Sequence, residues 1–172
     1  GFWVAVLLGG VIIRQTIPPR SREPLSIPDA ERVVLPSTDR LRLTAWRILQ
    51  RPLDPWILVY PGIDQAPGDL LPGIDALRGA GFNLLVLLPR AHRPSQGSAS
   101  SLGWLEQRDL EGALAYLSRQ PDVPDRPMGL WAVSTGATAG LLVAAHDERL
   151  GALALDSLSG PPAAALAHRV SR

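Results

Sequence analysis

The sequence predicts an α/β domain built on a mostly parallel sheet with flanking helices, and three observations support this prediction. Short segments that are wholly apolar recur along the chain, at 56–60, 83–88, 128–133 and 150–155. Segments with the apolar spacing of a helix lie between them, and glycine or proline marks the junctions. The chain has 172 residues, of which 46% are hydrophobic, so it suits one domain with one core. Strands that alternate with helices form parallel sheets covered on both faces.

Residues 1–13 are apolar without interruption, and Arg14 follows them. A helix needs about 20 apolar residues to cross a bilayer, so this stretch does not span one as written. We interpret it as part of a truncated amino-terminal membrane anchor; the alternatives are the apolar region of a signal peptide and a buried strand or helix. We therefore expect a membrane-associated protein, with a secreted or cytoplasmic one as the alternatives. Because Met128 is the only methionine, we also expect a cut or processed start.

Residues 14–30 are rich in proline, serine and arginine, which predicts a linker before a domain at 31–172. The domain begins with two expected strands, 31–36 and 41–49. Apolar and polar residues alternate at the start of the second strand, as in a strand with one buried face. The prediction is an antiparallel amino-terminal hairpin that turns at 37–39.

Helices are predicted between the apolar strands. Leu110, Ala113, Leu114 and Leu117 follow the i, i+3, i+4, i+7 spacing of one helix face. The expected helices lie around 70–77, 110–117 and 135–145, and the alanine-rich tail in 159–172 is expected to be helical. With 150–155 as the last strand, that strand would form an exposed apolar edge, and such edges favour association.

Three loops leave the carboxyl ends of the expected central strands, at 61–64, 89–92 and 132–136. In a parallel sheet these ends lie at one edge, where α/β proteins bind their ligands. In the third loop only Ser134 separates a strand from a helix, so the backbone must turn abruptly. Such a turn lifts the serine hydroxyl out of the sheet, and the next N–H, from Thr135, points toward an oxyanion.

The residues Gly-Leu-Trp-Ala-Val-Ser-Thr-Gly at 129–136 resemble the Gly-x-Ser-x-Gly elbow of the α/β-hydrolase family. The order of hairpin, strand, glycine loop and helix before it is similar to the same family, as is the segment 102–106 with Asp109. The chain resembles in particular the serine hydrolases with an amino-terminal anchor, from about residue 31 to residue 159. The resemblance implies an α/β-hydrolase-like fold whose carboxyl-terminal part is missing.

The resemblance also implies a reaction. Ser134 would be the nucleophile of a serine hydrolase that cleaves an ester, thioester or amide through an acyl-enzyme. The backbone N–H groups of Thr135 and Ile63 would hold the oxyanion. The implied partner is a small-molecule or acyl substrate. No cofactor or metal is expected.

The chain departs from the family pattern at several places. Ala132 replaces the first glycine of the elbow, and Pro61-Gly62 stands where the family usually has His-Gly. Residues 88–93 read Leu-Pro-Arg-Ala-His-Arg where the family tends to have Asp-x-Arg-Gly-His-Gly. Arg90 and His92 are kept, and each is either part of the loop scaffold or a contact to substrate.

The acid and base of a triad are not evident. In this fold they follow the serine in the order acid, then histidine. After Ser134 the aspartates are Asp147 and Asp156, and the only histidine beyond them is His168. Asp156 is a candidate acid at a strand end, although the family's Asp-Ser there is generally structural. We therefore expect the 172-residue chain itself to be inactive, with its triad partners in a missing part.

The sequence also allows other interpretations of Ser134 and other classes of protein. Ser134 could simply cap a helix, because serine is favoured at that position. The altered motifs also allow a non-catalytic binding or scaffold protein with this fold. A net charge of +1 gives no basic surface for nucleic acid, which is therefore not an expected partner. The absence of cysteine excludes disulfides, thiol catalysis and thiolate metal sites.

Overall fold

The computed structural model describes residues 20–21, 27–63, 65 and 67–158. The apolar stretch 1–13 and the alanine-rich tail lie outside the described residues, as does His168. Within the described part of the chain, no helix is long and apolar enough to cross a membrane.

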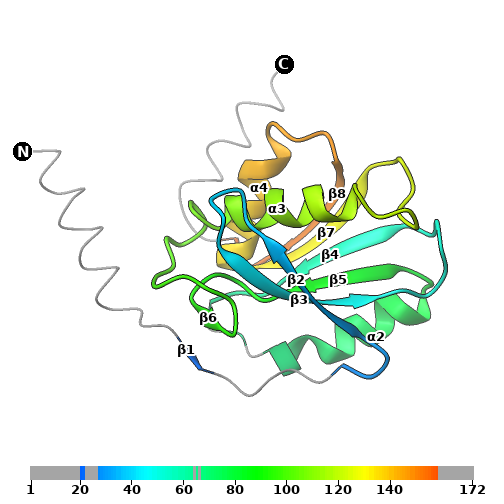
Figure 1. Ribbon diagram of the computed structural model, residues 1–172, viewed down its shortest axis with the longest axis horizontal. Coiled ribbons are helices and arrows are strands. Elements are labelled where there is room, and N and C mark those ends of the chain that lie inside the picture. The colour runs from blue at the N-terminus through cyan, green and yellow to red at the C-terminus, as the bar shows by residue number, and fades with distance from the viewer. Residues whose placement is uncertain (1–19, 22–26, 64, 66, 159–172) are drawn as a thin grey trace, which may run out of the picture.

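A six-stranded mixed sheet forms the centre of the domain, in the order β2-β3-β5-β4-β7-β8 (Figure 1). The pairs β2–β3 and β3–β5 are antiparallel, whereas β5–β4, β4–β7 and β7–β8 are parallel. The strands are β2 (Glu31–Pro36), β3 (Arg42–Ile48), β4 (Trp56–Tyr60), β5 (Asn83–Leu87), β7 (Met128–Val133) and β8 (Leu150–Asp156). The predicted hairpin and mostly parallel sheet are thus confirmed, with strand ends that differ from the prediction by one residue at most.

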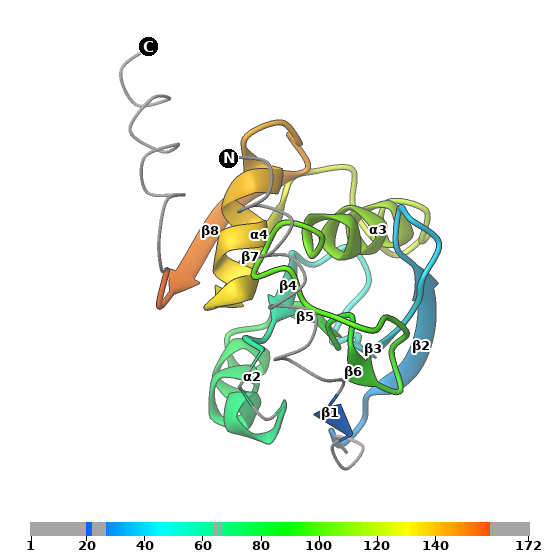
Figure 2. The ribbon, with the colours of Figure 1, turned by 90° about the vertical axis from the view of Figure 1, so that its left-hand side faces the viewer.

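Helices cover both faces of the sheet. α3 (Gln107–Leu117) and α4 (Thr135–Ala144) pack on one face, and α2 (Leu71–Gly79) lies on the other after the short 3-10 helix η1 (Pro67–Leu70) (Figure 2). The apolar sides of α3 and α4 join one buried cluster, and Ile74 of α2 joins a second. β4 supplies Leu58 to the first cluster and Val59 to the second. A strand buried on both faces must be apolar at every position, which explains the unbroken run at 56–60.

Among the residues that the structure describes, β8 forms one edge of the sheet. It pairs with β7 along its length, and only Leu150 among its residues is buried. Leu153 is 39% exposed, and it lines a pocket of about 460 Å³ with the neighbouring strands and α2. The predicted exposed apolar edge is therefore present.

A two-residue strand lies inside the segment predicted as a linker. β1 (Arg20–Ser21) pairs in parallel with β6 (His92–Arg93) in the loop after β5. The linker is therefore not entirely free of secondary structure, because backbone groups at 20–21 bond to this loop.

Candidate active site

Ser134 joins β7 directly to α4 in a strained backbone conformation. Its φ of 53° and ψ of −115° lie outside the regions that side-chain-bearing residues favour. Such conformations cost about 1–3 kcal/mol each and persist only when the surroundings hold them. Here the Ser134 N–H donates to the Asp156 carbonyl at 2.9 Å, and the Thr138 N–H donates to the Ser134 carbonyl at 3.1 Å. The end of β8 and the first turn of α4 therefore hold the elbow in place.

The Ser134 side chain does not cap α4. A capping serine has extended backbone angles, and its hydroxyl accepts a hydrogen bond from the first turn of the helix. Ser134 stands at the cap position but has neither the angles nor the side-chain bond. The structure thus rules out the interpretation of Ser134 as an ordinary helix cap.

Two glycines allow the backbone to pass close to Ser134. A Cβ on Gly136 would lie 2.8 Å from the Tyr60 carbonyl oxygen, closer than such atoms approach in proteins. A Cβ on Gly62 would lie 3.0 Å from the Ser134 Cβ. The loop after β4 therefore lies directly against the elbow. Ala132, which replaces a family glycine, is fully buried in β7 and leaves the turn intact.

The loop after β4 carries the second candidate oxyanion donor, Ile63. Ile63 follows the glycine that touches Ser134, and its side chain is buried. The Gln65 N–H donates to the Gly62 carbonyl at 3.2 Å, which holds the loop in a tight turn. The other candidate donor, Thr135, is the first residue of α4, where backbone N–H groups have no partner within the helix. Both donors thus belong to segments that adjoin the nucleophile.

His92 connects the loop after β5 to the loop after β4. Its Nε2 lies 2.9 Å from the Ile63 carbonyl oxygen, and its Nδ1 lies 3.1 Å from that of Arg90. The ring is 5% exposed. Of the two roles open for His92, the structure supports the loop scaffold.

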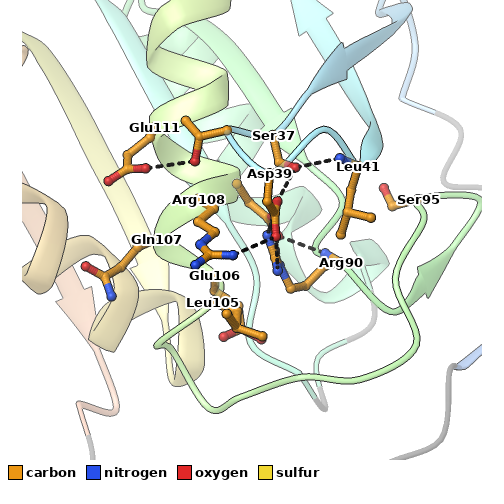
Figure 3. Close-up of polar contacts among 12 residues, drawn as sticks. Ser37, Asp39, Leu41, Arg90, Ser95, Leu105, Glu106, Gln107, Arg108 and Glu111 are labelled. Carbon is orange, nitrogen blue, oxygen red and sulfur yellow. Dashed lines mark hydrogen bonds and ion pairs between the residues drawn. The ribbon is translucent and has the colours of Figure 1, made fainter.

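Arg90 is the centre of a buried polar network (Figure 3). Its Nη2 donates to Asp109 at 2.7 Å, and its two Nη atoms donate to the Asp39 carboxylate at 3.0 and 3.1 Å. The Tyr60 hydroxyl donates to Asp109 at 3.0 Å. The network thereby ties the hairpin turn, β4, the loop after β5 and α3 together, so Arg90 also serves as scaffold.

Burial and charge shift the pKa values of this network in different directions. Burial raises the pKa of Asp39, but hydrogen bonds from Arg90, Ser37 and Arg108 outweigh it and lower the pKa to about 2. Burial raises the pKa of Asp109, and hydrogen bonds from Arg90 oppose that rise. Burial and the charge of Asp109 raise the pKa of Tyr60, which keeps its phenol neutral as a donor.

Glu106 shapes the loop that crosses the start of α4. Its buried carboxylate accepts hydrogen bonds from Ser100 Oγ at 2.7 Å, from Ser101 Oγ at 2.8 Å and from the Gly103 N–H at 2.8 Å. A Cβ on Gly103 would lie 3.1 Å from the Thr135 carbonyl oxygen. The motif at 102–106, singled out by resemblance alone, thus has a structural role beside the elbow.

The described histidines and the two aspartates after Ser134 each have another partner. His146 Nε2 lies 3.2 Å from Glu111, and His92 faces two carbonyl oxygens. Asp147 pairs with Arg149. The exposed Asp156 carboxylate accepts from the Ser157 hydroxyl at 3.0 Å. The residues that the structure describes therefore bring no histidine into contact with Ser134, and they contain no cluster of metal-ligating side chains.

Tyr60 and Asp39 also belong to this edge of the sheet, although neither was among the predicted site residues. Tyr60 carries the only hydroxyl in an otherwise apolar strand, and a buried phenol usually needs a polar partner. That feature was available from the sequence. The identity of the partner, Asp109, was not available from the sequence, because it lies 49 residues away.

Several solved structures are similar to this chain, although no protein-family model and no curated protein match it. The esterase Pf2001 of Pyrococcus furiosus has a TM-score of 0.70 and 22% identity, over 77% of this chain and 55% of its own. The α/β hydrolase GrgF from Penicillium sp. sh18 has a TM-score of 0.68 and 23% identity, over 83% and 54%. DcsB, in complex with its substrate analogue, has a TM-score of 0.67 and 27% identity, over 76% and 47%. The chain thus has the α/β-hydrolase fold and spans about half the length of these proteins.

Proposed function

We propose that the full-length protein is a serine hydrolase that cleaves an ester, thioester or amide through an acyl-enzyme at Ser134. The observation that carries this proposal is the strained elbow. The fold maintains a backbone conformation that costs about 1–3 kcal/mol at a serine whose hydroxyl has no capping role. Strain of this kind concentrates at functional sites, and it raises a side chain above the sheet edge where this fold binds ligands.

In the proposed reaction the Ser134 Oγ attacks the substrate carbonyl carbon and transfers its proton to a base. The N–H groups of Thr135 and Ile63 stabilise the negative charge that develops on the carbonyl oxygen. The leaving group departs with a proton, and water then hydrolyses the acyl-serine to release the acid and restore the hydroxyl. The base lies outside the described residues, and Asp156 remains the candidate acid.

The similar structures support this proposal at the level of chemistry. They include an esterase and a protein described as an α/β hydrolase, which places hydrolysis among the reactions found on this fold. Because the chain spans about half of each of them, the activity is proposed for the full-length protein. Its membrane association through residues 1–13 is likewise a proposal.

A non-catalytic binding or scaffold protein is the second candidate. The observation that favours it is the pairing of His92 and His146 with other groups, together with the altered residues Ala132 and Pro61. A catalytic protein must supply a histidine from the rest of its chain, and also an acid if Asp156 does not serve as one. A full-length sequence without an aspartate or glutamate loop and a late histidine would therefore favour the second candidate.

The test is covalent labelling of the full-length protein with a fluorophosphonate. We expect a mass increase on the peptide that contains Ser134, because the probe forms a stable adduct with an activated serine. A Ser134→Ala variant is the control and should not be labelled. A folded wild-type protein that remains unlabelled would contradict the proposal.

A further inference from the structure

We propose that His92 is a positioning residue that holds the backbone N–H of Ile63 in place for the oxyanion. This inference rests on the proposed hydrolase function. It assigns the loop after β5, which does not carry the nucleophile, a defined part in the reaction.

The His92 ring lies between two backbone carbonyl groups. Both of its nitrogens face carbonyl oxygens, at 2.9 Å for Ile63 and 3.1 Å for Arg90. A carbonyl oxygen only accepts hydrogen bonds, so a ring nitrogen must donate to make one. The proposed role places the proton on Nε2, which then donates to the Ile63 carbonyl. Loss of such a buried bond destabilises the loop, because the acceptor is left without a partner.

Hydrogen bonds hold the two peptide planes on either side of Ile63. The Ile63 N–H and the Gly62 carbonyl belong to one plane, and this carbonyl accepts from the Gln65 N–H at 3.2 Å. The Ile63 carbonyl belongs to the next plane, which His92 holds. With both planes held, the Ile63 N–H is restricted in rotation, as the role of an oxyanion donor requires.

The loop that carries His92 is rigid. Arg90 in this loop is 3% exposed and is anchored by the bonds to Asp39 shown in Figure 3. Asp109 anchors it as well, through a bond of 2.7 Å. The Arg90 carbonyl faces the second ring nitrogen of His92. The backbone N–H of His92 donates to the Pro89 carbonyl at 3.2 Å, so the anchored loop holds the imidazole against Ile63. A group that supports an oxyanion donor must be rigid in this way, because displacement by a fraction of an ångström weakens transition-state binding.

Two matched substitutions in the full-length protein separate positioning from general support of the fold. Glutamine places its side-chain N–H close to the position of Nε2, whereas asparagine reaches only the position of Nδ1. We expect His92→Asn to lower kcat by about 10- to 100-fold with KM within about threefold, because one oxyanion donor is worth about 10² to 10³ in rate. His92→Gln should keep kcat within about threefold of wild type.

A reversible inhibitor that forms a tetrahedral oxyanion on serine supplies the second readout. With a trifluoromethyl ketone, the inhibition constant of His92→Asn should weaken in proportion to its loss of kcat. Equal losses of kcat in the two folded variants would overturn the proposal and leave the hydrolase function standing. Wild-type protein that neither reacts with a fluorophosphonate nor turns over an ester would overturn the hydrolase function and, with it, this role of His92.

The wild-type protein supplies a measurement that does not depend on the folding of a variant. Nitrogen chemical shifts of the His92 ring report which nitrogen carries the proton. We expect a protonated Nε2 whose hydrogen exchanges slowly with solvent. A bare Nε2 would overturn the proposal, because it could not donate to the Ile63 carbonyl.

Discussion

Ser134 combines a strained backbone with a side chain that does no capping. A mutation that removes such backbone strain would stabilise the fold. A strained residue is therefore retained where it has a function. Gly62, in the loop after β4, and Gly136, in the first turn of α4, show the same requirement, because a methyl group there would collide with Ser134 or with the backbone. At the scale of single residues, the site is therefore defined by backbone geometry as much as by reactive groups.

Replacement of the strained serine should separate stability from activity. We expect Ser134→Gly to be more stable than Ser134→Ala by about 1 kcal/mol. Glycine adopts positive φ without strain, and this gain exceeds the cost of the entropy that glycine adds to the unfolded chain. Neither variant should react with a fluorophosphonate. Urea denaturation of the two variants measures the difference. A glycine variant no more stable than the alanine variant would show that the backbone at Ser134 carries little strain.

Gly136 and Gly79 form a matched pair for the close approach of α4 to β4. Gly136→Ala should destabilise the fold by about 1–3 kcal/mol, because the added Cβ would lie 2.8 Å from the Tyr60 carbonyl oxygen. Gly79→Ala, at the end of α2 with open space around it, should be neutral or should stabilise by up to about 1 kcal/mol. Thermal unfolding of both variants measures these effects. Equal changes in the two would mean that α4 does not depend on this glycine.

At the scale of elements, the Arg90 network joins four segments that are distant in the chain. Arg90 follows β5, Asp39 lies in the hairpin turn, Asp109 belongs to α3, and Tyr60 ends β4. These partners satisfy a guanidinium that is almost fully buried. Removal of Arg90 would leave the buried Asp109 without its ion pair, which is far costlier than loss of a surface pair.

The Asp39 carboxylate should make stability depend on pH in the acid range. Its pKa falls from 3.8 to about 2 on folding, so its stabilising effect is complete above pH 4 and is lost as the pH falls toward 2. The difference in unfolding free energy between wild type and Asp39→Asn should therefore become smaller as the pH falls toward 2. Urea denaturation between pH 2 and 6 measures it. A difference that stays constant with pH would mean that the pKa of Asp39 is not lowered.

At the scale of the whole molecule, one side of β8 pairs with β7, and most of the apolar residues of β8 are exposed. Its last residue also holds the Ser134 N–H, so the edge strand supports the elbow directly. An apolar edge with unpaired backbone groups is a template for association with other chains. The outer edge of the sheet and the candidate active site are therefore coupled through one strand.

The 172-residue chain should associate in solution through this edge. We expect light scattering to show a mass above that of a monomer, and Leu153→Lys to reduce it, because a charge on an edge strand opposes pairing. Val34→Lys is the control, since Val34 is exposed on β2 at the opposite edge of the sheet. A monodisperse monomer of the wild-type chain would contradict this prediction.

The sequence by itself determined the order of strands and helices, the hairpin, the exposed last strand and the position of Ser134 between β7 and α4. These features follow from periodicity and from runs of apolar residues, which report burial along neighbouring positions of the chain. The sequence also drew attention to Arg90 and His92, but it left them divided between scaffold and substrate contact.

Only the tertiary structure decided the backbone angles of Ser134, the absence of a capping bond and the roles of His92 and Arg90. His92 meets a carbonyl 29 residues away, and Tyr60 meets a carboxylate 49 residues away. No local pattern encodes such pairs, because they depend on which strand ends lie side by side in the sheet. The physical reason is that burial can be deduced from neighbouring residues, whereas a hydrogen-bond partner is set by the fold as a whole.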